Sequence, residues 1–129
     1  MEVRMGGCVQ QSTRCVKVKH LAAKLSGCDP VILNDEKRLK EILEEVSSAV
    51  KMSVLQRVSH RFEPQGVSLV YLLAESHISI HTWPECGVAD LEIVTCREES
   101  DVSVGLKLCK ERLKAVKVEH RVWTFAHNY

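Results

Sequence analysis

Residues 67–96 read VSLVYLLAESHISIHTWPECGVADLEIVTC and contain three strand-like segments in succession. Residues 67–75 include the longest apolar run of the chain, and residues 76–83 carry β-branched side chains at alternate positions until Pro84. Residues 88–96 alternate between two faces, which is the period of a strand with one buried side. The stretch therefore predicts three consecutive strands, the second of which begins close to the serine of AESH.

Further strands and two helices are predicted on either side of this stretch. Residues 16–25, 53–62 and 117–125 have strand character. Asp101 can cap a helix that ends near Ala115. An earlier amphipathic helix is predicted after the capping pair Asn34-Asp35, because apolar residues follow at helical spacing: Leu39, Ile42, Leu43, Val46 and Val50.

The order of these elements, β-α-β-β-β-α-β, predicts an α+β fold. Two helices on one face of a mostly antiparallel sheet make a two-layer α/β sandwich. The other face of such a sheet stays uncovered, so we expect a homodimer. The length fits a single domain, 1–129, with a loose tail at residues 1–14, where no hydrophobic periodicity is found.

Composition argues against several classes of partner. The formal net charge is +1 with both signs interspersed, which argues against nucleic-acid binding. No apolar run is long enough for a membrane span and no secretory signal is recognisable, so we expect a cytoplasmic protein without membrane contact. None of the six cysteines forms a C-x-x-C pair, which argues against a zinc ribbon, and we expect reduced thiols rather than a disulfide framework.

Residues 74–86, AESHISIHTWPEC, gather reactive side chains in one segment. On a strand, the histidines of H-x-x-x-H lie about 13 Å apart, so we expect no metal site. The G-x-S-x-G elbow of many hydrolases is absent, and a cysteine nucleophile at Cys96 with His81 as its base rests on two residues alone. The polar face of an ordinary strand is the simplest interpretation of this pattern.

One further reaction would use more of this segment. A serine at a strained junction can attack its own preceding carbonyl, which converts the amide to an ester. β-Elimination then releases the upstream chain, and hydrolysis of the serine remnant leaves a pyruvoyl group at the new N-terminus. The reaction needs an acid or base and a group that holds the oxyanion, and His81 and Ser68 are candidates for these parts.

The residues of this region also resemble a known family. AESHISIHTWPE, with HRFEPQGVS before it, TC after it and KHLAAKLSGCDP near the start, is similar to the short bacterial and archaeal type of S-adenosylmethionine decarboxylase. The resemblance covers roughly residues 18–120. It implies a dimer of two-layer sandwiches and a pyruvoyl cofactor made from Ser76 when the Glu75–Ser76 bond is cleaved. Cleavage would give a β chain, 1–75, and an α chain, 76–129.

The resemblance also implies a role for each site residue. Ser68 and His81 would assist cleavage, and Cys96 would donate a proton during decarboxylation. Phe62 would stack on the base of S-adenosylmethionine, and Glu85 would bind its ribose hydroxyls. A pyruvoyl carbonyl can form a Schiff base with the substrate amine and act as the electron sink, and a thiol with a pKa of about 8.5 is mostly protonated at pH 7. The implied product, decarboxylated S-adenosylmethionine, serves polyamine (spermidine) synthesis.

Other substrates and roles stay open at this point. Leu69, Cys86 and Val88 stand where the family usually has other residues, and these positions line the expected pocket. A decarboxylase of the same fold that acts on arginine or ornithine is therefore an alternative. A second alternative is an unprocessed, non-catalytic homologue that pairs with an active subunit.

Overall fold

One antiparallel sheet forms the centre of the computed structural model, which describes residues 15–98 and 100–128. The tail predicted at residues 1–14 lies outside the described residues. Within them, six strands follow the order β2-β3-β4-β5-β1-β6 across the sheet, and all neighbours are antiparallel. The strands are β1 (Cys15–Ser26), β2 (Val54–Arg61), β3 (Val67–Leu73), β4 (Ser76–Trp83), β5 (Val88–Thr95) and β6 (Lys117–Asn128). All predicted strands are present, and β6 continues past its predicted end.

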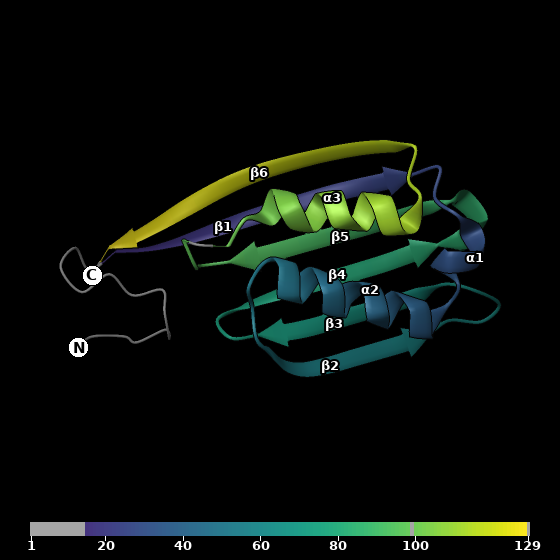
Figure 1. The fold of residues 1–129 in the computed structure, drawn as a ribbon, viewed down its shortest axis with the longest axis horizontal. Helices are drawn as coiled ribbons and strands as arrows, with labels where there is room; N and C mark the ends of the chain where they lie inside the picture. Colours follow the sequence, from purple (N-terminus) through teal and green to yellow (C-terminus); the bar gives the residue numbers. More distant parts are fainter. Residues whose placement is uncertain (1–14, 99, 129) are drawn as a thin grey trace.

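Both long helices cover the same face of the sheet (Figure 1). α2 (Glu36–Ala49) begins where the Asp35 carboxylate accepts a hydrogen bond from the Arg38 amide at 3.0 Å. α3 (Val102–Leu113) begins at Asp101, which accepts from the Ser103 amide. The predicted α+β sandwich is therefore confirmed. A short helix, α1 (Pro30–Leu33), is additional to the prediction and starts with a proline, whose missing N–H is not needed there.

The core lies between the helices and the covered face of the sheet. The predicted apolar stripe of α2 is fully buried against this face, where Ile78 and Ile80 of β4 also point. The hydroxyl of Thr82 donates a hydrogen bond to the Leu33 carbonyl at 2.7 Å and accepts one from the Val67 amide at 2.9 Å. This buried threonine joins α1 to β3 and β4 and fixes one end of the sheet.

The opposite face of the sheet, which we call the open face, carries no helix of the part of the chain that the structure describes. The alternation along β4 places His77 and His81 on it. Large apolar side chains remain exposed there, among them Val70, Leu72, Trp123 and Phe125. Because β3 and β6 are four strands apart, these side chains form two separate groups, and exposed apolar side chains of this kind are typical of interaction surfaces. Among the described helices, none has the length and apolar character that a membrane span needs.

Candidate functional site

The turn between β3 and β4 holds the predicted cleavage bond. Leu73 pairs with Ser76, so Ala74 and Glu75 form a two-residue hairpin loop. Glu75 has a φ of 69°, in the left-handed region where glycine is usual at the second position of a turn. For a residue with a Cβ, this conformation costs on the order of 1 kcal/mol or more. The structure therefore places backbone strain directly before the Glu75–Ser76 bond.

Ser76 and Cys96 are both buried beside this bond. The Ser76 hydroxyl donates a hydrogen bond to the Ala74 carbonyl at 3.4 Å. The Cys96 sulfur lies 3.4 Å from the carbonyl oxygen of Glu75. The Glu75 carbonyl is the group that Ser76 has to attack during self-cleavage, and charge would develop on its oxygen. The structure thus brings three predicted site residues together around one peptide bond.

The cysteines correct one expectation from the sequence. Cys28, Cys86 and Cys109 are free, but Cys96 is disulfide-bonded, and its partner is none of these three. Cys96 packs against Val16 at the start of β1, a neighbour that the strand pairing creates and the spacing in the sequence does not reveal. A disulfide sulfur carries no proton, so the donor role expected for Cys96 requires its reduced form.

Ser68 and His81 form a second group on the open face. They stand directly opposite each other in the β3–β4 ladder, and 2.6 Å separates Ser68 Oγ from His81 Nδ1. A hydroxyl held against an imidazole in this way is suited to proton transfer. The two residues expected to assist cleavage are therefore in contact with each other.

Phe62 and Glu85 lie at the same end of the sheet as this pair. Phe62 directly follows β2, and its ring contacts that of His60 edge-on, with centroids 4.6 Å apart. Glu85 lies in η1 (Pro84–Cys86), the short helix after β4. Both side chains are exposed and accessible to a ligand, as binding of the substrate would require.

The two groups do not meet within one chain. Ser76 begins β4 and His81 stands five residues further along it, which corresponds to about 16 Å. Ser76 shares the buried side of the strand with Ile78, whereas His81 lies on the open face. The pair of Ser68 and His81 therefore cannot contact the Glu75–Ser76 bond of its own chain.

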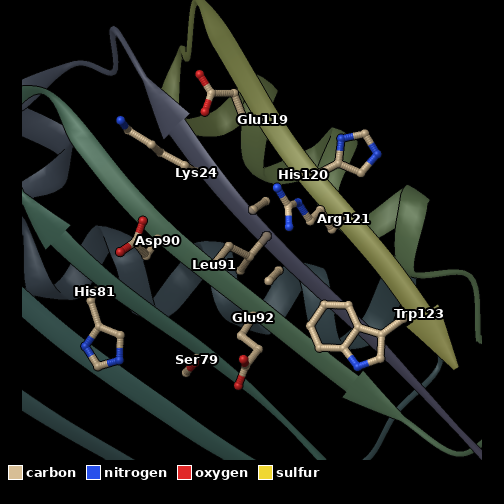
Figure 2. A pocket seen from close by; sticks show the side chains of 12 residues that line it. Lys24, Ser79, His81, Asp90, Leu91, Glu92, Glu119, His120, Arg121 and Trp123 are labelled. Carbon is tan, nitrogen blue, oxygen red and sulfur yellow. The ribbon is translucent and has the colours of Figure 1, made fainter. Parts of the chain in front are cut away.

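A cavity of about 750 Å³ lies on the open face. Figure 2 shows side chains around it from four neighbouring strands, including His81 of β4, Glu92 of β5, Lys24 of β1 and Trp123 of β6. Of these residues, sequence reasoning had assigned a role only to His81. The alternation of Glu119, Arg121 and Trp123 was visible in the sequence, but the face they share is set by pairing with β1. No three metal-binding side chains gather here or elsewhere in the described residues.

Comparisons with known proteins agree on one family. The model of the family described as S-adenosylmethionine decarboxylase matches residues 19–124. The S-adenosylmethionine decarboxylase proenzyme of Pyrobaculum islandicum is 41% identical over 107 residues, covering 82% of this chain and 86% of that protein. The Archaeoglobus fulgidus proenzyme is 38% identical over 104 residues, covering 81% and 93%.

Solved structures show the same likeness. The adenosylmethionine decarboxylase of Aquifex aeolicus superposes with a TM-score of 0.78 at 29% identity, covering 84% of this chain and 89% of that one. The Trypanosoma brucei enzyme superposes with a TM-score of 0.61 over 81% of this chain and 45% of its own, and at 20% identity it supports the fold alone.

Proposed function

The chain belongs to the S-adenosylmethionine decarboxylase family, and we propose that it cleaves itself at Glu75–Ser76 and then decarboxylates S-adenosylmethionine for polyamine (spermidine) biosynthesis. Enzymes of this family depend on a pyruvoyl group made by self-cleavage at a serine. The observation that carries the proposal is the left-handed Glu75 directly before a buried Ser76, with Cys96 beside the carbonyl. These residues fit the formation of that group.

Self-cleavage needs no reagent other than water. Ser76 Oγ attacks the carbonyl carbon of Glu75, the amide C–N bond breaks, and the freed nitrogen takes the hydroxyl proton. A base then removes the Cα proton of Ser76, the Cβ–O bond breaks, and Glu75 keeps the carboxylate at the end of the β chain. Water hydrolyses the remaining unsaturated residue to the pyruvoyl group and releases ammonia. In this scheme Ser68 and His81 move protons, and strain at Glu75 favours the forward direction.

We also infer a homodimer whose two sites each use both chains. Ser76 and Cys96 lie at one end of the strands, whereas Ser68, His81, Phe62 and Glu85 lie toward the other. A two-fold axis in the plane of the open face and perpendicular to the strands would bring one end of each protomer against the other end of its partner, and the contact would be isologous. The exposed apolar side chains of Val70 and Leu72 on the open face support this packing. One dimer then contains two equivalent sites.

In turnover, the pyruvoyl group supplies the electron sink when carbon dioxide leaves the substrate. Reduced Cys96 donates a proton to the substrate α-carbon, Phe62 stacks on the base, and Glu85 accepts the ribose hydroxyls. The need for a reduced thiol supports a cytoplasmic location, because thiols are kept reduced there. The named relatives are S-adenosylmethionine decarboxylases, which favours S-adenosylmethionine over arginine or ornithine as the substrate. The intact cleavage residues weigh against a non-catalytic partner subunit.

Two measurements on the purified protein test the proposal. Denaturing mass spectrometry should show a β chain of residues 1–75 and a pyruvoyl-blocked α chain of residues 76–129, with Ser76→Ala as the uncleaved control. Release of labelled carbon dioxide should be fastest from S-adenosylmethionine when it is compared with arginine and ornithine. An intact wild-type chain would remove the enzyme assignment, and faster release from arginine or ornithine would remove the substrate.

A further inference from the structure

We propose that Trp123, held in place by His20, forms a binding platform for the nucleoside part of the substrate. The proposal rests on the function proposed above, and it adds a site on β6 to the residues expected from the sequence. Trp123 is 39% exposed and lines the cavity on the open face together with His81 (Figure 2). An accessible indole in a cavity offers a flat, apolar surface of the kind on which bases stack.

His20 stacks on this indole, and Phe125 in turn contacts His20. Trp123 is the cross-strand partner of His20, and the two rings stack with centroids 5.1 Å apart and an interplanar angle of 4°. Phe125 contacts the His20 ring edge-on, with centroids 5.7 Å apart. The imidazole therefore supports the indole. A ring whose rotation is already restricted loses less entropy when a ligand binds to it.

The position of the platform suits a substrate that reacts near Cys96. Phe125 stands opposite Val18 in the β1–β6 ladder, and Val18 packs against Cys96 at the end of β5. β6 is two strands away from β5, so the backbone at Phe125 lies about 10 Å from that of the proposed proton donor, and Trp123 is two residues, or about 7 Å, further along β6. A substrate with its α-carbon at Cys96 can extend its nucleoside across β1 to Trp123.

The charges around the platform suit a cationic nucleoside. Three carboxylates line the cavity, those of Asp90, Glu92 and Glu119, against the two cations Lys24 and Arg121. The excess of negative charge attracts the sulfonium of S-adenosylmethionine, which is also attracted to an aromatic face. Arginine is a cation too, but it has no base to stack on the indole. A neutral nucleoside therefore separates the proposed platform from simple charge attraction.

The fluorescence of Trp123 provides a direct test of binding. Trp123 and Trp83 are the only tryptophans of the chain, so Trp83→Phe leaves Trp123 as the single reporter. 5′-Methylthioadenosine, a neutral nucleoside, should quench this emission with saturation in the full-length protein. Arginine and ornithine at the same concentrations should leave it unchanged. The measurement needs no turnover, so it can be repeated with Ser76→Ala in the uncleaved chain.

Kinetic variants test the same platform during the reaction. Trp123→Leu should raise the KM for S-adenosylmethionine about five- to a hundredfold with little change in kcat, which is the range for loss of one stacked base. Trp123→Phe should restore most of the affinity, and His20→Phe, which keeps a ring beneath the indole, should bind better than His20→Ala. Val122→Ala, whose side chain lies on the other face of β6, is the matched control and should keep the wild-type KM.

Three binding or kinetic results would each overturn the proposal. They are the absence of quenching by 5′-methylthioadenosine, equal quenching by arginine, and a wild-type KM for Trp123→Leu. Emission that changes with protein concentration and not with nucleoside would instead place the second copy of the chain on Trp123, and it too would overturn the proposal. Saturable nucleoside binding without any decarboxylation would leave the platform in place and remove the proposed function.

Discussion

Co-expression of two defective variants would show whether each site uses residues from both chains. Ser76→Ala removes the hydroxyl that we propose as the attacking group, and His81→Ala removes the imidazole that we propose assists it. If Ser76 works with His81 of the partner subunit, a mixed dimer has one site with both residues intact and one site with neither. If each site lies within one chain, both sites of the mixed dimer are defective.

The structure sets the size of the expected effect. Ser76 and His81 are separated by about 16 Å along β4, far beyond the reach of a hydrogen bond at about 3 Å. Equal expression and random pairing give about half mixed dimers, so about a quarter of all sites should be intact. Loss of an acid–base group slows a reaction roughly 10²–10⁴-fold, so each variant alone should give little background cleavage.

The assay is denaturing mass spectrometry of mixed dimers purified through two different affinity tags. Only the His81→Ala chain should be cleaved, because it alone keeps Ser76. A reciprocal control pairs the wild-type chain with the double variant Ser76→Ala/His81→Ala, and here the wild-type chain should stay intact. Cleavage of the wild-type chain in that control, with none in the first mixture, would refute a site shared between two chains.

Four further changes have defined outcomes. Cys96→Ala should still permit cleavage but lower the release of labelled carbon dioxide roughly 10²–10⁴-fold. Turnover by the wild-type enzyme should require a reductant. Equal rates of carbon dioxide release with and without Cys96 would exclude the donor role. In the uncleaved Ser76→Ala background, Glu75→Gly should raise the melting temperature by a few degrees, because it relieves about 1 kcal/mol of backbone strain. An unchanged melting temperature in calorimetry would argue against that strain. Gly105→Ala should lower the melting temperature although alanine favours helix by about 1 kcal/mol. A Cβ there would lie 2.9 Å from Ile93 Cδ1, 3.1 Å from Val50 Cγ1 and 3.3 Å from Val46 Cγ1, so three buried side chains would have to move together. At pH 8 iodoacetamide should modify Cys86 but spare Cys28 and Cys109, because burial raises the pKa of Cys28 to about 11 and that of Cys109 to about 12. The stability that these two protonated thiols provide should be lost as the pH rises from about 9 toward 12.

The elements of the fold were predictable because their signals are local. The apolar spacing from Leu39 to Val50 and the cap at Asp35 are enough to define α2. The alternation in residues 88–95 defines β5 in the same way. α1 was missed because four residues are too few for a helical period, although Asp29 and Pro30 carry a helix-start signal.

The arrangement of the site could not be read from the sequence in the same way. Ser76 and His81 are close in the chain, and a motif that contains both suggests one cluster. On a strand, however, residues an odd number apart point to opposite faces, so the side chains of this pair diverge. Trp123 shows the reverse case, because only the pairing of β6 with β1 places it beside His20 and the cavity.

The location of the proposed cleavage bond would allow the fold to survive the reaction. Glu75 lies in a hairpin loop, outside the β3–β4 ladder, and its left-handed backbone leaves its carbonyl beside Cys96. Breaking the bond after Glu75 releases this strain and removes no ladder hydrogen bond between Ser68–His81 and Leu72–His77. The strands on both sides also keep their outer partners, β2 and β5. The two products of the proposed cleavage would therefore stay paired as one sheet, with the pyruvoyl group formed from Ser76 at the end of β4, close to Cys96.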